Sequence, residues 1–332
     1  MPKLVLDPQE LDEVNALARR TLDRYGAADD VEFLVDAAAI AAELPASIHH
    51  FLNRFRREEL GTCIIGGHEV DGAGIGPTPA HWDHGGDPRR TEVFDTRLVL
   101  YSAVIGEVFG WATQQNGRII HDVLPIRGNE HKQLGSASKS VLEWHTEDAF
   151  HEHRPDFVVL GCLRNPDGAE TTVADTVGLD LDPDHVKVLF EERFTIQPDE
   201  SHLPASNTVQ ADQDFARIEA MLHRPKPLAV LFGDPERPYI RADRSFWAPV
   251  EGDDQAARAL EALTEAMDGR QRDVTLEPGD YCFIDNHVVV HGRKPFTARY
   301  DGTDRWLKRV CVTRDLRTSR EVRSSLLSHV AH

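Results

Sequence analysis

The chain has 332 residues and a formal net charge of −19, and 40% of its residues are hydrophobic. This length fits one antiparallel β domain with helical additions, and the apolar content supplies a sizeable core. The strong negative charge argues against nucleic acid and anionic membrane surfaces as partners. Most of the charge is expected to serve solubility, and a smaller part to suit a cationic ligand.

The cysteine pattern and the first residues indicate the compartment. The four cysteines, Cys63, Cys162, Cys282 and Cys311, form no C-x-x-C pair, and three of them lie in apolar runs. Buried thiols in a reducing environment explain such a pattern. The opening MPKLVLDPQELDEV lacks the apolar core of a signal peptide, and no stretch is long and apolar enough for a membrane span. We therefore expect a cytoplasmic protein with no membrane association.

The first 112 residues are expected to be mainly helical. Apolar residues at helical spacing predict a helix that follows Asp7–Pro8 and stops at Gly26. The other elements expected here are helices over 33–44, 48–55 and 91–112, a strand over 63–65 and a loop rich in Gly, Pro and His over 72–90.

From Arg118 onward, short β-rich runs alternate with turn residues. Strands are expected at 119–124, 141–144, 157–163, 171–175, 194–197, 228–232, 239–242, 274–276, 281–285, 288–290 and 306–312, and helical interruptions at 182–190 and 254–267. The predicted fold class is α+β: a double-stranded β-helix (jelly roll) core with a helical N-terminal layer and helical insertions. We expect one domain over 1–332, with the helical layer over 1–112 and the jelly-roll core over 113–320.

One candidate metal-binding pattern lies at the end of the run 141–144. Two His-x-acidic patterns occur in the chain, at His81 and at His145. The pattern is common by chance, and the copy at His81 lies in the Gly/Pro loop, where a solvated loop explains it better. His145 and Glu147 follow a predicted strand, in which residues two apart face the same side. Both side chains are therefore candidates to reach one metal ion.

The second half of the set is His291, at the end of the apolar run 288–290, with Arg305 fourteen residues later. Two imidazoles and one carboxylate are the ligand set of non-haem Fe(II) oxygenases. An arginine shortly after the second histidine suits a dicarboxylate co-substrate. Arg305 and Arg309 face the same side of a strand, and two carboxylate-bearing small molecules would satisfy both guanidinium groups. Structural ion pairs with Asp or Glu are the alternative explanation.

The segments WHTEDAFHEHRPDFVVLGCLRN, IDNHVVVHGRKPF and RYDGTDRWLKRV resemble the clavaminate-synthase-like Fe(II)/2-oxoglutarate oxygenases over roughly residues 61–320. That branch uses glutamate as its carboxylate ligand, as at Glu147. The chain is most similar to the amino-acid β-hydroxylases that act on free arginine, enduracididine and asparagine. The resemblance also implies a place in antibiotic biosynthesis.

The resemblance implies roles for particular residues. His145, Glu147 and His291 would bind Fe(II), and Arg305 would pair with the distal carboxylate of 2-oxoglutarate. Thr172 is the expected hydroxyl partner of Arg305, with Thr171 as the alternative because the strand register is not visible. The substrate would be bound at three places: its α-carboxylate by Arg309, its ammonium by Glu147 or a glutamine of Gln114–Gln115 (Gln114 first), and a guanidinium side chain by Asp199, Ser201 and Asp243. Asp199 is otherwise a loop acid in an acidic protein.

The sequence thus predicts an Fe(II)- and 2-oxoglutarate-dependent dioxygenase that uses O2 to hydroxylate C3 of a free L-amino acid, most simply arginine or a guanidino relative. The loops 72–90 and 198–226 are expected lids. Alternatives are another free amino acid (enduracididine, asparagine or lysine), a desaturase or cyclising oxygenase, and a metal-free jelly-roll binding protein. Glu147 argues against a halogenase, which needs a small residue at that position. The sequence does not indicate the oligomeric state.

Overall fold

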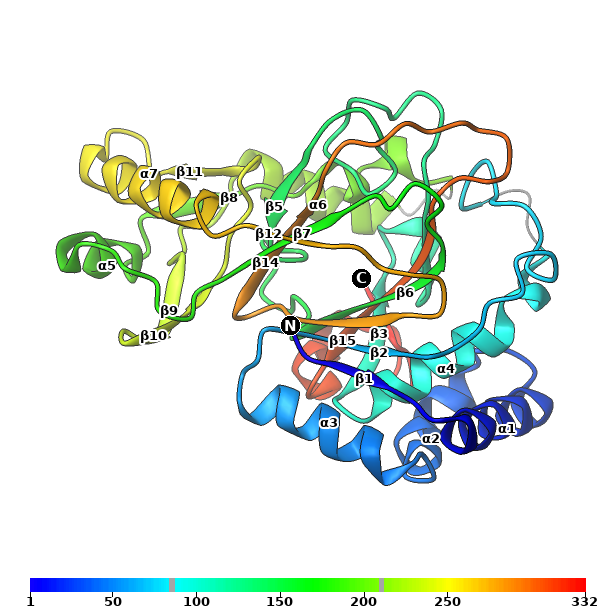
Figure 1. Cartoon of the computed structure of the whole chain (residues 1–332). Coiled ribbons are helices and arrows are strands. Elements are labelled where there is room, and N and C mark those ends of the chain that lie inside the picture. The colour runs from blue at the N-terminus through cyan, green and yellow to red at the C-terminus, as the bar shows by residue number, and fades with distance from the viewer. Residues whose placement is uncertain (84–86, 209–211) are drawn as a thin grey trace.

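The structure is a computed structural model that describes residues 1–83, 87–208 and 212–332. The fold is mixed α/β, with two main sheets and helices on their outer faces (Figure 1). The larger sheet has eight strands in the order β1-β2-β13-β6-β15-β3-β16, with β4 paired to β15. Its strands are β1 (Lys3–Val5), β2 (Thr62–Gly66), β3 (Glu107–Trp111), β4 (His121–Val123), β6 (Phe157–Arg164), β13 (Tyr281–Asp285), β15 (Trp306–Thr313) and β16 (Val330–Ala331).

The smaller sheet has four strands in the order β12-β7-β14-β5. They are β12 (Arg272–Val274), β7 (Thr171–Asp175), β14 (Val289–Arg293) and β5 (Leu142–His145). Two further antiparallel pairs are β10 (Arg237–Ile240) with β9 (Leu231–Asp234), and β11 (Trp247–Pro249) with β8 (Phe194–Ile196).

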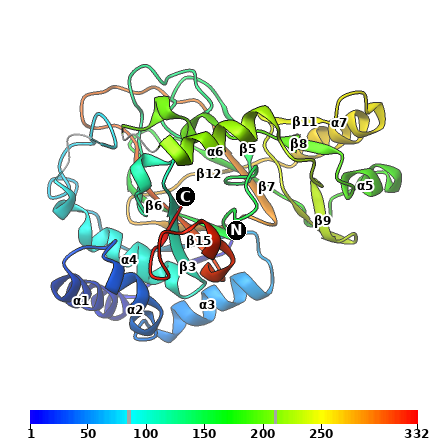
Figure 2. The same cartoon turned by 180° about the vertical axis from the view of Figure 1, so that it is seen from behind.

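The helices form two groups. The first consists of α1 (Pro8–Tyr25), α2 (Val31–Ala41), α3 (Ala46–Arg57) and α4 (Glu92–Ala103). The second consists of α5 (Pro183–Leu189), α6 (Asp212–His223) and α7 (Asp254–Asp268), and α5 and α7 lie together far from the first group (Figure 2). Short 3-10 turns are η1 (Pro88–Arg90), η2 (Gln115–Gly117), η3 (Glu200–His202), η4 (Pro204–Ser206) and η5 (Leu316–Val322). No helix in the described residues is long and apolar enough to cross a membrane.

Each face of the larger sheet packs in a different hydrophobic cluster, because alternate residues of a strand point to opposite faces. On β13, Tyr281 and Phe283 pack with the helices α1–α4, whereas Cys282 and Ile284 join a cluster with residues of β7, β12 and β14. Successive side chains on a strand point to opposite faces, so the two sheets pack face to face, with the first helix group on the outside. A third cluster joins α5 and α7 to the outer face of the smaller sheet.

β15 and the residue before it direct Arg309 and Arg305 into the space between the sheets, whereas Lys308 faces the first helix group and forms an ion pair with Asp95 of α4. Leu307, on the same face as Arg305 and Arg309, packs in the inter-sheet cluster, and all three line one cavity. The expectation that both arginines share a face is therefore confirmed. All four cysteines are buried free thiols, as expected.

The predicted helix over 91–112 is wrong in its second half. α4 ends at Ala103, and residues 107–111 form β3, which pairs with β15 at Cys311 and Phe109. Val108, Phe109 and Trp111 are β-branched or aromatic, and their partner strand lies two hundred residues away in sequence. Local periodicity could not reveal this long-range pairing.

Other boundaries differ in smaller ways. β1, β11, β16 and α6 were not predicted, and α6 occupies part of the expected loop 198–226. Residues 84–86 and 209–211, within the two expected lid loops, lie outside the described residues. The remaining predicted helices and strands are present, with ends shifted by up to three residues.

The turn between β12 and β13 depends on Gly279. Gly279 has φ +92°, and a Cβ there would lie 1.9 Å from the His68 carbonyl oxygen. We expect Gly279→Ala to lower the free energy of unfolding by more than about 2 kcal/mol, because a left-handed backbone alone costs about 1–2 kcal/mol for an L-residue. Urea unfolding checks this. Gly252→Ala is the control, since Gly252 has φ +80° with nothing within 4 Å of its Cβ position; equal losses in both variants would contradict the steric argument.

Candidate metal and substrate site

Two antiparallel strands place the two histidines opposite each other. His145 ends β5 and lies in register with His291 of β14, and their ring centroids are 4.6 Å apart. The His145 Nδ1 atom lies 2.9 Å from the Glu143 carbonyl oxygen. If Nδ1 carries the proton and donates to that carbonyl, Nε2 keeps a free lone pair for a metal.

Gly292 allows the strands around His291 to come close together. The pairing of β14 with β5 is irregular between His291 and Arg293. A Cβ at Gly292 would lie 2.5 Å from the Leu142 carbonyl oxygen and 3.0 Å from the Thr172 hydroxyl. A side chain at position 292 would therefore push β5 and β7 away from β14, and glycine avoids this.

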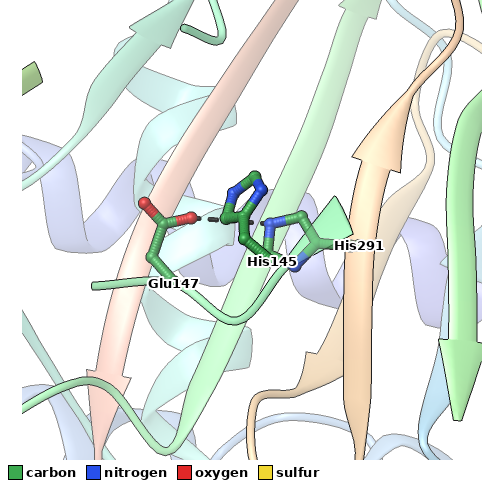
Figure 3. Close-up of side chains that lie close together, drawn as sticks. All are labelled: His145, Glu147 and His291. Atoms are coloured by element: carbon green, nitrogen blue, oxygen red, sulfur yellow. Dashed lines mark ion pairs between the residues drawn. The ribbon is translucent and has the colours of Figure 1, made fainter. Parts of the chain in front are cut away.

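Glu147 completes a cluster of three candidate ligands. One ligand atom each of His145, Glu147 and His291 lies within 4.8 Å of the others, and the three side chains converge in Figure 3. Glu147 Oε2 lies 3.5 Å from His291 Nε2, and neither Glu147 Oε2 nor His291 Nδ1 has a hydrogen-bond partner among the described residues although both are buried. Buried polar atoms without partners are costly, so the cluster suits a bound cation.

The electrostatics favour an ionised Glu147. Burial alone would raise the pKa of Glu147, but Arg309, His291 and His145 outweigh it and hold the pKa well below its usual range. Burial lowers the pKa of His291. Burial also acts to lower the pKa of His145, but the carboxylates of Asp243 and Glu147 raise it overall. The set therefore offers one anionic oxygen, as a divalent metal requires.

Asn286 fixes the peptide of Glu147. This fully buried side chain accepts a hydrogen bond from the Glu147 backbone N–H at 2.7 Å and donates to the carbonyls of Glu147, at 3.1 Å, and Pro155, at 2.8 Å. Asn286 follows β13, one strand earlier than His291. Sequence reasoning missed it, and its only signal was its place in the quoted segment IDNHVVVHGRKPF.

Arg309 forms an ion pair with Glu147, through Nη1 and Oε1. Its Nη2 lies 3.3 Å from Gln114 Oε1 and 2.7 Å from His121 Nδ1. Burial acts to lower the pKa of Arg309, yet Glu147 and neighbouring acids raise it, so the guanidinium stays charged. The sequence prediction named Arg309 and Gln114 but not His121.

Arg305 is a buried cation whose hydroxyl partner is Thr171. Arg305 Nη2 lies 3.3 Å from the Thr171 hydroxyl, and Arg305 forms no ion pair with a carboxylate in the described residues. The hydroxyl beside Arg305 in the structure is thus that of Thr171, the alternative, and not that of Thr172: neighbouring residues of β7 face opposite sides, and of the two only Thr171 lines the cavity. Burial lowers the pKa of Arg305 to about 10, which a bound anion would reverse.

The residues predicted to bind the substrate side chain belong to the same cavity. Asp199, Ser201 and Asp243 line it together with the three candidate metal ligands, Arg305 and Arg309. Burial raises the pKa of Asp243 to about 7, although His145 opposes the shift. Asp199 caps η3 through the Ser201 N–H at 2.7 Å, and Ser201 accepts a hydrogen bond from Gln114 at 2.7 Å.

One cavity-lining cation was not predicted. Arg293, two residues after His291, is buried, and burial with neighbouring Arg305 lowers its pKa to about 9. It donates to the carbonyls of Lys294 and Ser140. The cavity is thus lined by three guanidinium groups, those of Arg293, Arg305 and Arg309, and by carboxylates, together with the metal-ligand cluster.

A mixed α/β fold with two imidazoles and one carboxylate around a pocket defines a class: non-haem iron oxygenases, in which this set leaves metal positions open. Residues 89–311 match the family described as taurine catabolism dioxygenase TauD, TfdA family. The chain belongs to this family, and it is a dioxygenase.

Several characterised proteins are similar over their full length. An enduracididine beta-hydroxylase of Streptomyces hygroscopicus is 40% identical, with 100% of both chains covered. An L-ornithine/L-arginine 3-hydroxylase of Catenulispora acidiphila is 43% identical, with 96% of each covered. The non-heme iron oxygenase OrfP, solved with Fe, succinate and (3S)-hydroxy-L-Arg, has a TM-score of 0.95 at 45% identity over 100% of both chains. OrfP with Fe and alpha-ketoglutaric acid has a TM-score of 0.90 at 43% identity over the same coverage.

The hydrogen bonds of Asn286 both satisfy buried backbone groups and hold the peptide of Glu147 in place. We expect Asn286→Leu to lower the free energy of unfolding by about 3 kcal/mol or more, because each buried backbone group left without a partner costs about 1–3 kcal/mol. Fe(II) affinity should fall by about 10- to 100-fold, the usual effect of losing a group that orients a ligand. Urea unfolding and anaerobic Fe(II) titration measure the two effects.

Asn165→Leu is the matched control. Asn165 also makes three hydrogen bonds to backbone groups, those of Ala169 (two) and Leu276, away from the ligand cluster. It should lose stability but keep Fe(II) affinity. A similar loss of Fe(II) affinity in both variants would show that Asn286 has no particular effect on the ligand geometry.

Proposed function

We propose that the protein is an Fe(II)- and 2-oxoglutarate-dependent hydroxylase that acts at C3 of free L-arginine or a related guanidino amino acid. The observation that carries the proposal is one cavity that the cluster of His145, Glu147 and His291 lines together with guanidinium groups and carboxylates. The similarity to hydroxylases of arginine and enduracididine over the full chain supports the same reaction.

The residues fit a ferrous ion. Three ligand atoms within 4.8 Å of one another, with two buried atoms lacking partners among the described residues, suit one octahedral cation with positions to spare. When bound, the ion would take 2-oxoglutarate and O2, and decarboxylation of 2-oxoglutarate to succinate would drive replacement of a substrate C–H bond by C–OH. His145, Glu147 and His291 would hold the ion.

Arg305 suits the distal carboxylate of 2-oxoglutarate. Its guanidinium is buried without a carboxylate partner in the described chain, and the Thr171 hydroxyl lies beside it at 3.3 Å. A desolvated cation of this kind is stabilised by an anion, and a planar fork of donors matches a carboxylate. Arg293, adjacent to Arg305, adds positive potential to the same end of the cavity.

The remaining groups suit the two ends of a cationic amino acid. Arg309 would hold the α-carboxylate, and Glu147 or Gln114 the ammonium group. Asp199, Ser201 and Asp243 would face the guanidinium, whose five donors call for carboxylate partners. Holding both ends would present one C–H bond to the metal, so the contribution of the protein is orientation.

The proposal extends to the architecture and the cellular location of the protein. We infer that the two packed sheets are the halves of a double-stranded β-helix and that the chain forms one domain. β1, β2 and β3 extend the larger sheet, although they lie within the first 112 residues. The free buried cysteines support a cytoplasmic location, and the acidic composition argues against nucleic acid as a partner.

A metal-free binding protein would explain the acids and Arg309 but not the three-ligand cluster. Anaerobic addition of Fe(II) and 2-oxoglutarate separates these alternatives, because the oxygenase gives a weak visible charge-transfer band. A screen of free amino acids for succinate release, followed by mass analysis, then tests the substrate. Gain of one oxygen by arginine supports the proposal, whereas loss of two hydrogens indicates a desaturase or cyclising enzyme. Release only with asparagine or lysine would overturn the guanidino assignment.

We expect Glu147→Ala to abolish hydroxylation, because the metal loses its anionic ligand. Mass analysis of the product from arginine provides the measurement, and circular dichroism checks that the fold is intact. Glu58→Ala is the control, since Glu58 forms an ion pair with Arg54 of α3 and does not line the cavity. Full activity of Glu147→Ala would remove Glu147 from the metal site.

Asp243→Ala should weaken arginine binding by roughly 2–5 kcal/mol, the cost of leaving one member of a buried charge pair unpaired. Isothermal titration of the Fe(II)/2-oxoglutarate enzyme under nitrogen measures the affinity. Asp234→Ala removes an exposed carboxylate from β9 and should leave the affinity unchanged. An unaltered arginine affinity in Asp243→Ala would contradict the assignment of Asp243 to the side-chain pocket.

A further inference from the structure

A second polar cluster, centred on Asp148 and His202, lies directly behind the site cavity. Both side chains are buried, and His202 Nε2 lies 2.9 Å from Asp148 Oδ1. Neither residue is among those that line the cavity. Buried ion pairs contribute little net stability, because the cost of desolvation offsets their attraction. Stability alone therefore does not explain why this pair lies next to the site.

Asp148 is held by donors from three side chains. Besides His202, Trp111 Nε1 donates to its Oδ2 at 2.6 Å, and Gln114 Nε2 lies 3.3 Å from its Oδ1. Asp148 also adopts a left-handed backbone conformation, with φ 50°, immediately after Glu147. The carboxylate is therefore fixed in place beside the metal-ligand cluster.

His202 connects the same group to the segment that carries the pocket acids. Its Nδ1 lies 2.8 Å from the Thr113 hydroxyl, and its ring packs against Phe150 with centroids 4.9 Å apart. It ends η3, the turn that contains Ser201 and is capped by Asp199. Asn207 adds to this attachment, since its Nδ2 donates to the Thr113 and Ser201 carbonyls at 2.7 and 3.1 Å.

Three chain segments thus meet at one buried pair. The loop after β5 contributes Glu147 to the site cavity, and η3 contributes Ser201 and its cap Asp199. The segment after β3 contributes Gln114 to an adjoining cavity that Ser201 and Arg309 also line. A small displacement of η3 would move Asp199 and Ser201 relative to the metal ligands without altering the metal ligands themselves. Reaction rates are sensitive to such displacements of about 1 Å.

We propose that His202 and Asp148 are positioning residues that set the distance between the side-chain pocket on η3 and the metal-ligand cluster. They act through Asp199 and Ser201 and do not touch substrate. The inference rests on the proposed function, because it assigns the pocket on η3 to the amino-acid substrate. It goes beyond that function by naming the contact that determines where the bound side chain lies.

The test compares His202→Leu with His202→Gln and Thr113→Val. We expect His202→Leu to raise KM for arginine by about tenfold or more and to lower the amount of hydroxyarginine formed per succinate, because a displaced substrate is oxidised less efficiently. The affinity for 2-oxoglutarate, measured by the anaerobic charge-transfer band, should change less than about twofold, since Arg305 and Thr171 lie outside the cluster. His202→Gln retains a donor toward Asp148 and should recover most of the coupling.

His68→Leu is the matched control, because His68 is another buried histidine with two polar side-chain partners, Tyr101 and Arg97, in the first helix group. It should leave KM and coupling unchanged. If His202→Leu does not fold, Thr113→Val removes only the hydroxyl contact to His202 and should shift KM in the same direction by a smaller factor. Unchanged KM and coupling in the folded variants, or equal losses of arginine and 2-oxoglutarate affinity, would overturn the proposal.

The failure of this inference is distinguishable from the failure of the proposed function. A wild-type enzyme that releases no succinate with arginine contradicts the function itself. A wild-type enzyme that hydroxylates arginine, together with a His202→Leu variant of the same KM and coupling, contradicts only the positioning pair.

Discussion

The register between β5 and β14 is the constraint on which the site depends. It places His145 directly opposite His291, and the loop after β5 then brings Glu147 to the same point. A shift of one residue would turn one histidine to the other face of the sheet. Two further residues support this arrangement: Gly292 permits close approach of the neighbouring strands, and Asn286 holds the peptide of Glu147.

Burial of charged groups around the cavity explains both the pKa shifts and the choice of ligands. Arg305 and Arg293 have depressed pKa values, whereas Asp243 has a raised pKa. Each shift has burial as its largest cause, so each group gains when a ligand of opposite charge arrives. Arg309 differs because it already forms an ion pair with Glu147. This partner raises the pKa of Arg309, so the guanidinium stays charged, and it holds the group beside the metal ligands.

Much of the molecule was predictable because its signals are local. The capped first helix after Asp7, the strand over 281–285 and the shared face of Arg305 and Arg309 all follow from periodicity and turn residues. β3 was misread as helix because its partner strand is remote in sequence, and strand pairing overrides local preference. His121 and Asn286 were missed for a related reason: each acts on a residue from a distant segment.

The sequence by itself determined the chemistry available to this protein: two histidines, a glutamate and an arginine at spacings that suit a metal and a dicarboxylate. Only the tertiary structure decided which neighbours these residues have. It selected Thr171 over Thr172, added Arg293 to the cavity and placed Asp148 and His202 behind it. The physical reason is that residue type fixes what a group can bind, whereas strand register and burial between remote segments fix where it points and how strongly it is charged.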